Sequence, residues 1–312
     1  MLPVDWPPLP PLQAVGCRWL ERAGIELALL RLDLIDPLIS GNKWYKLAPH
    51  LAEAQRTGAR GLISLGGAHS NHLHALAAAG ARFGFATVGL LRGHELDTPT
   101  VRDLRRFGMQ LHWLGYGGYR ERHREDFWAP WLVRHPDCLP VAEGGRSLAA
   151  AQECASLVGM IARGLTALGW ADYDQLWAAA GSGTTLAGLV LGERGTHPVV
   201  GTLAVPDDHG VAAAVAQLLD AAGAAPAGYR LLDASRGGFA RLDGELARCL
   251  LDFEAETGVP LEPLYTGKLL LALRQAVADG EVAAGSRIVA VHSGGLQGRR
   301  ALAERLRELA DG

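Results

Sequence analysis

Short apolar runs rich in strand-forming residues alternate along most of the chain with alanine- and leucine-rich stretches at helical spacing. The apolar runs, which we predict to be strands, span residues 27–32, 61–65, 86–91, 174–180, 199–205 and 287–292. The stretches at helical spacing span residues 47–55, 71–81, 100–107 and 186–191. Strands that alternate with helices pair in parallel and carry helices on both faces. We therefore predict an α/β fold built mostly of parallel sheets.

The length of the chain bears on its domain organisation. At 312 residues, of which 49% are hydrophobic, it exceeds the usual size of a single core. We expect a smaller domain of residues 49–156 and a larger domain assembled from residues 1–48 and 157–312. Glycine and polar residues gather where the expected strands end, and ligands bind at that edge of open α/β sheets.

Charge and cysteine usage narrow the range of partners. The chain has 30 basic and 33 acidic residues and no dense basic block, so we expect neither a nucleic acid nor a membrane as partner. Its first eight residues lack the features of a signal peptide, and no apolar stretch is long enough to span a membrane. The four scattered cysteines fit reduced structural thiols. The expectation is a cytoplasmic protein that binds a small molecule.

The segment Ser40–Leu47 contains the strongest catalytic candidate, Lys43. A lysine amine attacks a carbonyl group only when it is unprotonated, so a catalytic lysine usually lies in a pocket that lowers its pKa. Gly41 allows close approach of the backbone to a ligand, and the aromatic residues after Lys43 can bury the next turn while Lys46 extends outward. A lysine in a loop before a helix is also a common solvated charge, and the segment alone leaves both interpretations open.

A glycine-rich loop lies between an expected strand and an expected helix in the second half of the chain. Its residues are Gly181, Ser182, Gly183, Thr184 and Thr185. They offer backbone N–H groups and three hydroxyl groups at the positive end of a helix dipole, which favours phosphate binding. The loop has neither the Gly-Lys-Ser/Thr of a Walker A motif nor the full Gly-x-Gly-x-x-Gly of a dinucleotide site. A purely structural glycine turn is the alternative.

A polar cluster at residues 66–74 follows the second expected strand and contains His69, His72 and His74. No Asp, Glu or Cys lies in it, and on a helix His72 and His74 would point to different faces, so we expect no metal. Ser70 and Asn71 stand at the expected helix start. They are either ordinary caps or ligands for a substrate carboxylate and a cofactor oxygen.

Together these motifs resemble the fold-type II pyridoxal-phosphate enzymes, and most closely the D-cysteine desulfhydrase and 1-aminocyclopropane-1-carboxylate deaminase family. The similar motifs occur in order along most of the chain: Pro11-Leu12-Gln13, Asn42-Lys43, Ser70-Asn71-His72, Glu143-Gly144-Gly145, Thr184-Thr185 with Ala187-Gly188, Leu264-Tyr265-Thr266-Gly267-Lys268 and His292-Ser293-Gly294-Gly295. Each motif is weak alone, but the set is specific. The resemblance implies a two-domain fold similar to the tryptophan synthase β subunit, pyridoxal 5'-phosphate as cofactor, a small amino acid as substrate and a homodimer.

The resemblance also implies a role for each matching residue around the cofactor. Lys43 would hold the cofactor as a Schiff base and then move protons, and Asn71 would bond its phenolic oxygen. The loop Gly181–Thr185 would hold the phosphate, with Lys46 adding positive charge. Thr266 would lie next to the pyridine nitrogen.

On the substrate side, the resemblance implies contacts from several residues: Ser70, Asn71, His72, Gly144 and Tyr265. Ser70 would bind the carboxylate or assist proton transfer, and Tyr265 would project into the site as a further catalytic residue. Closure of one domain on the other would bring these two side chains over one cofactor.

Thr266 bears on the choice of activity. A hydroxyl beside the pyridine nitrogen stabilises a protonated ring less than a carboxylate does, which suits α-proton removal and β-elimination. The deaminase pattern has a glutamate at this position, so we expect conversion of D-cysteine to pyruvate, sulfide and ammonia, with the cyclopropane deaminase as the alternative. His69 and His74 depart from the family's usual Gln and Arg, which leaves the substrate less constrained than the chemistry.

Two other classes of protein remain open from the sequence. A dinucleotide-dependent oxidoreductase could use the glycine loop, but an acidic ribose partner is missing at the expected distance. A non-catalytic pyridoxal-phosphate-binding protein would carry the same motifs. The visible absorbance of a lysine-bound cofactor, and its response to amino acids, would separate the three.

Overall fold

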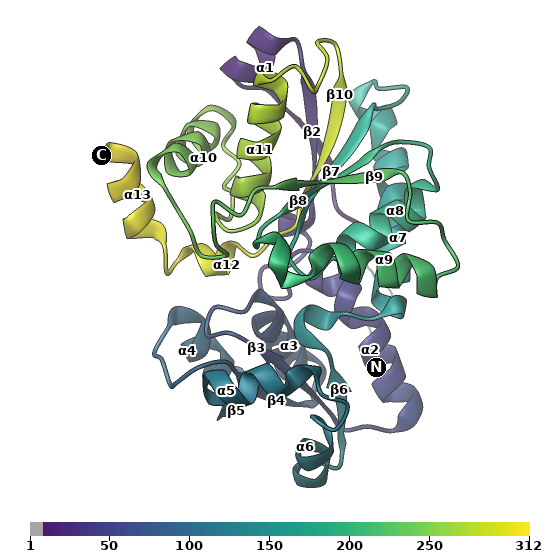
Figure 1. Cartoon of the computed structure of the whole chain (residues 1–312), viewed down its shortest axis with the longest axis vertical. Helices are drawn as coiled ribbons and strands as arrows, with labels where there is room; N and C mark the ends of the chain where they lie inside the picture. The colour runs from purple at the N-terminus through teal and green to yellow at the C-terminus, as the bar shows by residue number, and fades with distance from the viewer. Residues whose placement is uncertain (1–8) are drawn as a thin grey trace.

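Two sheets flanked by helices make up the computed structural model, which describes residues 9–312 (Figure 1). The larger sheet has the strand order β1-β2-β10-β7-β8-β9. Its strands are β1 Leu12–Val15, β2 Glu26–Arg31, β7 Gln175–Ala180, β8 Val199–Leu203, β9 Tyr229–Asp233 and β10 Arg287–His292. The smaller sheet, ordered β5-β4-β3-β6, consists of β3 Gly61–Gly66, β4 Ala86–Leu91, β5 Gln110–Trp113 and β6 Cys138–Val141. The expectation about the first eight residues lies outside the described residues.

Thirteen α-helices connect and cover these strands in the described part of the chain. They are α1 Arg18–Ala23, α2 Lys43–Thr57, α3 Asn71–Phe83, α4 Pro99–Arg106, α5 Gly115–Arg120, α6 Ala129–Arg134, α7 Leu148–Leu165, α8 Thr184–Glu193, α9 Val211–Ala221, α10 Gly244–Thr257, α11 Thr266–Ala278, α12 Leu296–Arg299 and α13 Ala303–Asp311. Short 3-10 turns lie at Leu32–Leu34, Glu121–His123, Glu143–Gly145, Thr166–Leu168 and Asp207–His209.

The predicted α/β fold with mostly parallel sheets is confirmed. The smaller sheet is parallel throughout, and in the larger one β1 alone runs antiparallel, pairing with β2 in the register Leu12 to Leu30. β1 is an edge strand that reaches β2 through the short helix α1, and a short return suits antiparallel pairing. The smaller sheet spans residues 61–141, and the proposed domain limits near residues 48 and 156 stay a prediction.

Successive side chains of a strand point to opposite faces of the larger sheet, and the two faces belong to different hydrophobic cores. In β2, Leu27 and Leu29 pack with α10 and α11, whereas Ala28 and Leu30 pack with α7 and α8. Figure 1 shows α10 and α11 on one side of this sheet and α7 and α8 on the other. Because both faces are covered, β2 and β7 are apolar between their terminal residues, as is usual for parallel sheets.

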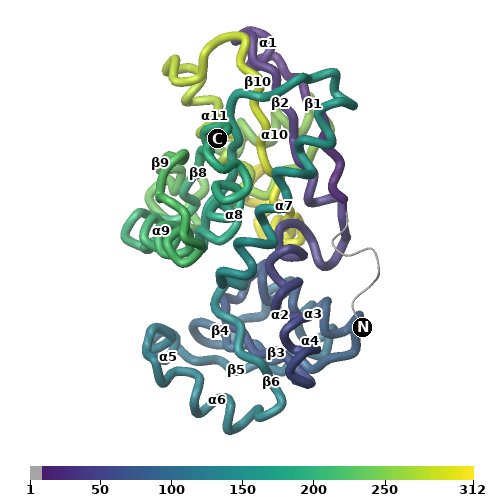
Figure 2. The backbone as a smooth tube through the Cα atoms, turned by 90° about the vertical axis from the view of Figure 1, so that its right-hand side faces the viewer, coloured from purple at the N-terminus to yellow at the C-terminus, as the bar shows by residue number. Residues whose placement is uncertain are grey.

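Helix α7 joins the halves of the molecule. Helix α7 runs from the lower half in Figure 2, where the smaller sheet lies, to the upper half, and it packs against both α2 and α8. The core cluster on this side includes Leu62 of β3 and Leu176 of β7, so it is continuous between the sheets. The described residues contain no helix long and apolar enough to cross a membrane.

The start of α2 differs from the sequence prediction. The helix was expected from residue 47, but it begins at Lys43 and continues through Pro49 to Thr57. Apolar periodicity does not mark this first turn, because Trp44, Tyr45, Lys46 and Leu47 are all buried whatever face they occupy. Lys43 therefore stands at a helix N-terminus and not in a preceding loop.

Candidate active site

The segment before α2 lies directly against the turn that follows β10. The backbone N–H of Asn42 donates to the Ser293 carbonyl oxygen at 3.2 Å. Gly41 has φ 73°, and a Cβ there would lie 1.9 Å from the same oxygen. Only glycine satisfies both the left-handed backbone and this close approach. Two segments about 250 residues apart in the sequence are thus joined beside Lys43.

Lys43 is half-buried and contacts the glycine-rich loop through Asn42. Its Nζ donates to Asn42 Oδ1 at 3.0 Å, and Asn42 Nδ2 donates to Thr185 Oγ1 at 2.8 Å. Burial lowers the pKa of Lys43 to about 8, although Cys154 and Glu262 act in the opposite direction. Much more of this amine is therefore unprotonated near neutral pH than of an ordinary lysine. The interpretation of Lys43 as a solvated surface charge is wrong.

Lys46 points into the same site, and the expectation that it extends outward is wrong. It lies one helical turn after Lys43 and is 2% exposed, and its Nζ donates to Ser182 Oγ at 2.9 Å. A Cβ at Gly144 would lie 3.3 Å from Ser182 Oγ and 3.8 Å from Lys46 Nζ. Burial, followed by repulsion from Lys43, lowers the pKa of Lys46 well below its usual range. An anion bound beside Ser182 would relieve this cost by restoring a partner for the ammonium group.

The glycine-rich loop connects β7 to α8 in a form suited to an anion. Gly183 has φ 76° at the N-cap, and a Cβ there would lie 2.8 Å from Val215 Cγ2. Thr184 and Thr185 form the first turn of α8, whose N–H groups have no partners within the helix. These N–H groups, the hydroxyl groups and Lys46 converge on one place, as expected for a phosphate site.

Ser70 and Asn71 lie at the start of α3, as the sequence predicted. Ser70 Oγ accepts from Leu73 N at 3.1 Å, so Ser70 is the cap of the helix, while its hydroxyl proton remains available to a ligand. Asn71 Oδ1 accepts from Gln297 Nε2 at 2.9 Å, and a Cβ at Gly295 would lie 2.6 Å from Asn71 Nδ2. Asn71 therefore reaches the same turn after β10 that contacts Gly41.

The three histidines separate in space. His72 Nε2 lies 2.8 Å from Ser64 Oγ, and because that hydroxyl donates to the Val141 carbonyl oxygen, His72 Nε2 carries the proton. The other edge of His72 faces Gly145, next to Lys46. His74 instead faces Asp103, and His69 is exposed. Within residues 9–312 no three side chains of His, Cys, Asp or Glu are grouped to hold a metal ion.

Tyr265 and Thr266 lie at the N-terminus of α11, across the glycine loop from α2. A Cβ at Gly181 would lie 2.8 Å from Tyr265 Cε1, so this loop and the tyrosine ring are in contact. Thr266 Oγ1 accepts from Glu262 N at 2.8 Å and donates to the Glu262 carbonyl oxygen at 3.0 Å. Its single proton is thus used, and the hydroxyl can offer a further ligand only a lone pair.

Glu262 is a buried site residue that the sequence did not reveal. Its side chain accepts from the N–H groups of Leu264 and Tyr265 at 3.0 and 2.8 Å. Burial raises its pKa to about 7, against these N–H groups and the charges of Lys268 and Lys43. In sequence it resembles a loop carboxylate between two prolines, and its position just before Tyr265 was the only available signal.

Cys154 and Gln297 also went unnoticed in the sequence. Cys154 of α7 is buried close to Lys43, Lys46 and Thr185, and burial raises the pKa of its thiol to about 11. Gln297 lies in the short helix α12 after β10. Each reaches the site through contacts between distant segments, and neither belongs to a motif or a periodic pattern.

Comparison with known proteins identifies the group that such a site would hold. The sequence model of the family described as "Pyridoxal-phosphate dependent enzyme" matches residues 8–294. The chain belongs to this family. Pyridoxal phosphate is therefore its cofactor, and the dinucleotide interpretation is set aside. A half-buried lysine of lowered pKa beside a phosphate-type loop fits an aldehyde-bearing phosphate ester.

Several members of the family are similar over nearly the whole chain. A Pyrococcus horikoshii protein, provisionally named 1-aminocyclopropane-1-carboxylate deaminase, is 29% identical over 88% of this chain and 86% of its own. The bifunctional D-cysteine desulfhydrase/1-aminocyclopropane-1-carboxylate deaminase of Arabidopsis thaliana is 28% identical over 88% of this chain and 73% of its own. A crystal structure described as an ACC deaminase homologue superposes with a TM-score of 0.83 at 26% identity, over 96% of this chain and 93% of that one.

Proposed function

We propose that this member of the family converts D-cysteine to pyruvate, sulfide and ammonia. The choice of this activity over the deaminase rests on Thr266. Its hydroxyl offers a lone pair where an acidic side chain would offer a negative charge. A cofactor ring beside it is stabilised less in its protonated form, which favours loss of a good leaving group after α-proton removal. Relatives named for desulfhydrase activity, including one from Salmonella choleraesuis at 26% identity, are consistent with this choice.

The residues of the site would have the following roles in this reaction. The bound cofactor withdraws electrons from the substrate α-carbon. Lys43 Nζ, with its lowered pKa, takes the α-proton, and sulfide leaves from the β-carbon. Ser70 and the N-terminus of α3 bind the substrate carboxylate, where a negative charge is favoured. Hydrolysis then consumes one water molecule. In total, D-cysteine and water give pyruvate, hydrogen sulfide and ammonia.

Parallel assays of D-cysteine, L-cysteine and 1-aminocyclopropane-1-carboxylate test this proposal. Sulfide and pyruvate should form in equal amounts from D-cysteine, and more slowly or not at all from L-cysteine. Absence of turnover of D-cysteine would rule out the proposed substrate. Release of 2-oxobutanoate from the cyclopropane amino acid alone would establish the deaminase instead.

The deaminase is the second candidate because relatives at similar identity are named for it. A non-catalytic carrier is the third, and it predicts cofactor absorbance that no amino acid changes. We also propose a cytoplasmic homodimer. The four cysteines are free thiols, which suits a reducing compartment, and sedimentation equilibrium would measure the assembly.

A further inference from the structure

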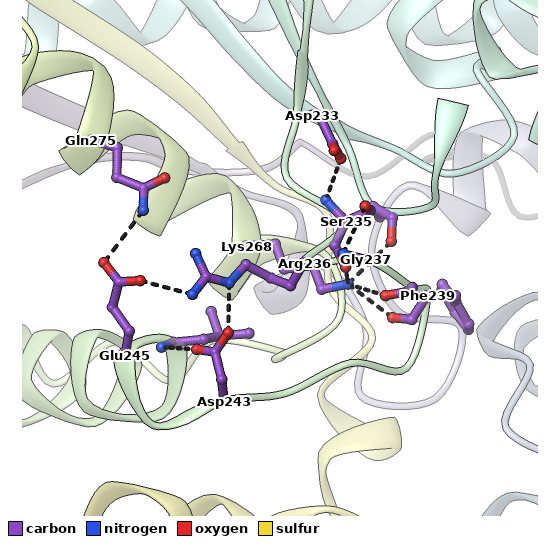
Figure 3. A network of polar contacts seen from close by, with 12 residues as sticks. Asp233, Ser235, Arg236, Gly237, Phe239, Asp243, Glu245, Lys268 and Gln275 are labelled. Carbon is purple, nitrogen blue, oxygen red and sulfur yellow. Dashed lines mark hydrogen bonds and ion pairs between the residues drawn. The ribbon is translucent and has the colours of Figure 1, made fainter. Parts of the chain in front are cut away.

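Lys268 is enclosed by backbone carbonyl groups in the interior of the larger half of the molecule. Its Nζ lies 2.8 Å from the Ser235 oxygen, 2.9 Å from those of Gly238 and Phe239, and 3.2 Å from that of Ala204 (Figure 3). An ammonium group has three protons, so four carbonyl oxygens share them. This arrangement resembles the carbonyl coordination of a monovalent cation more than an ion pair.

Lysine is used sparingly in this chain. Three of its 30 lysine and arginine residues are lysines, and none of the three is exposed. Lys43 and Lys46 line the candidate active site, and Lys268 is 1% exposed. A planar guanidinium group would not fit within four converging carbonyl oxygens, whereas a compact ammonium group does. The buried position 268 thus requires the compact ammonium group of a lysine, a requirement that surface positions lack.

The carbonyl groups come from the ends of two neighbouring strands. Ala204 follows β8, and the loop 235–239 follows β9. Within that loop Arg236 and Gly237 have φ values of 59° and 77°. A non-glycine residue in the left-handed region is held there by its surroundings, and Arg236 is bound to Asp243 at 2.7 Å and to Glu245 at 2.7 Å. The loop is therefore shaped around the ammonium group (Figure 3).

The loop touches the candidate active site through one side chain. Phe239, whose carbonyl oxygen binds Lys268, packs edge-on against Tyr265 with the ring centroids 5.6 Å apart. Tyr265 in turn lies against Gly181 of the glycine loop. The chain of contacts runs from Lys268 through Phe239 to a ring at the cofactor-binding loop. Lys268 and Tyr265 also belong to the same helix end, three residues apart.

The charge on Lys268 is part of this arrangement. Burial lowers its pKa to about 8, while Glu262 and Asp233 act in the opposite direction. Lys268 is thus mostly protonated at neutral pH, and a neutral amine would turn a lone pair toward one of the carbonyl oxygens. Without the cation, four carbonyl groups, of which those of Ala204 and Ser235 are buried, would face one another and the loop would have to move.

We propose that Lys268 is a built-in cation that positions Tyr265, by fixing the loop 235–239 and with it the ring of Phe239. It is a positioning residue, because it acts through others and not on the substrate. The proposal rests on the assignment of Tyr265 to the substrate side of the site. Replacement of the side chain should create a vacancy that a free monovalent cation of similar size can fill.

Cation rescue of Lys268→Ala tests the proposal. In tetramethylammonium chloride, whose cation is too large for the vacancy, KM for D-cysteine should rise by about tenfold with a smaller change in kcat. Potassium or ammonium chloride at equal ionic strength should restore most of the loss and raise the Tm of this variant. The unchanged protein should be indifferent to the choice of salt.

Two further variants separate the steps. Lys268→Met fills the space without charge and should be impaired in every salt. Phe239→Ala leaves the four carbonyl groups and Lys268 in place, so it should raise KM like Lys268→Ala but show no cation dependence. A fall in Tm of Lys268→Ala without any rise in KM, or an unaltered KM in Phe239→Ala, would overturn the positioning role.

The Tm measurements keep this proposal distinct from the proposed substrate. If the unchanged protein turns over no D-cysteine, the proposed substrate is wrong. The variants are then compared by amino-acid binding in place of KM. The measured quantity is the amino-acid concentration that gives half of the maximal change in cofactor absorbance. A Tm of Lys268→Ala that is equal in potassium and tetramethylammonium salts would contradict the built-in cation whatever the substrate.

Discussion

Lys43 and Lys46 lie one turn apart on α2, yet their amines have different hydrogen-bond partners. Lys43 contacts Asn42, which contacts Thr185, while Lys46 contacts Ser182 of the glycine loop. Burial lowers the pKa of both amines. The sequence predicted a pocket that lowers the pKa of Lys43, but it could not show that Lys46 points inward, because that direction depends on segments more than 90 residues away.

Replacement of the two lysines should separate catalysis from cofactor binding. In the proposed mechanism Lys43 is both the covalent anchor and the acid/base group, so Lys43→Ala should lower kcat by about 10³-fold or more. Lys46→Ala should mainly raise the Kd of pyridoxal phosphate, by about 10- to 100-fold, because a charged hydrogen bond is lost. Steady-state kinetics at saturating cofactor, with a fluorescence titration of the apoprotein, measure both. Equal losses of kcat in the two variants at saturating cofactor would contradict the division.

The pH dependence of cofactor attachment reports the state of Lys43. The unprotonated amine attacks the aldehyde, so the rate constant for rebinding of pyridoxal phosphate to apoprotein should rise with pH and level off above about 8. Stopped-flow absorbance measures this rate. A rate that still climbs toward pH 10.5, the ordinary value for lysine, would show that the site does not lower the pKa.

At the scale of elements, the sequence predicted most strands and helices but not which of them contact one another. The strand 86–91 and the helix starting at Asn71 agree with β4 and α3, because apolar runs and a serine cap mark them locally. The first turn of α2, the antiparallel β1 and the neighbours Glu262 and Gln297 depend on packing between distant segments. A pattern with a period reveals an element, whereas a single polar residue in a loop does not reveal its partner.

The contact between Gly41 and the turn after β10 can be tested with a matched glycine pair. Gly41 and Gly58 have nearly equal φ values of 73° and 74°, but a Cβ at Gly58 would meet nothing within 4 Å. Gly58→Ala should lower the free energy of unfolding by about 1–2 kcal/mol, the cost of a left-handed alanine. Gly41→Ala should cost about 3 kcal/mol or more, because the Ser293 backbone must also move. Urea denaturation measures both, and equal losses would show that the close approach has little energetic weight.

At the scale of the whole molecule, Asp103 joins the smaller half to the C-terminal segment. Its carboxylate, on α4, contacts His74 at 3.2 Å, Arg106 at 3.1 Å and Arg300, which lies between α12 and α13. Burial acts to raise the pKa of Asp103, but Arg300, His74 and Arg106 outweigh it and leave the pKa below its usual range. The contact stabilises the folded chain only while Asp103 is ionised.

Asp103→Asn should therefore destabilise the protein in a pH-dependent way. At neutral pH the free energy of unfolding should fall by about 2–3 kcal/mol. Because the folded-state pKa is lowered, the difference from the unchanged protein should persist above 3.8, the ordinary value for Asp, and shrink as the pH falls through the folded-state pKa. Asp97→Asn, at an exposed carboxylate 3.6 Å from Arg102, should change stability by less than about 0.5 kcal/mol. A pH-independent effect of Asp103→Asn would contradict the charge contribution.

The joining of the two halves brings Lys43 and Lys46 of α2 to the place where the glycine loop, the start of α3 and the turn after β10 lie together. The decisive measurement is the position of the cofactor after borohydride reduction. The reduced holoprotein is digested, and mass spectrometry locates the added pyridoxyl group among Lys43, Lys46 and Lys268, the three lysines of the chain. The predicted result is full labelling of Lys43 alone, with no labelled peptide from Lys43→Ala. Labelling of Lys46 or Lys268 in the unchanged protein, or no label on any lysine, would contradict the assignment of Lys43.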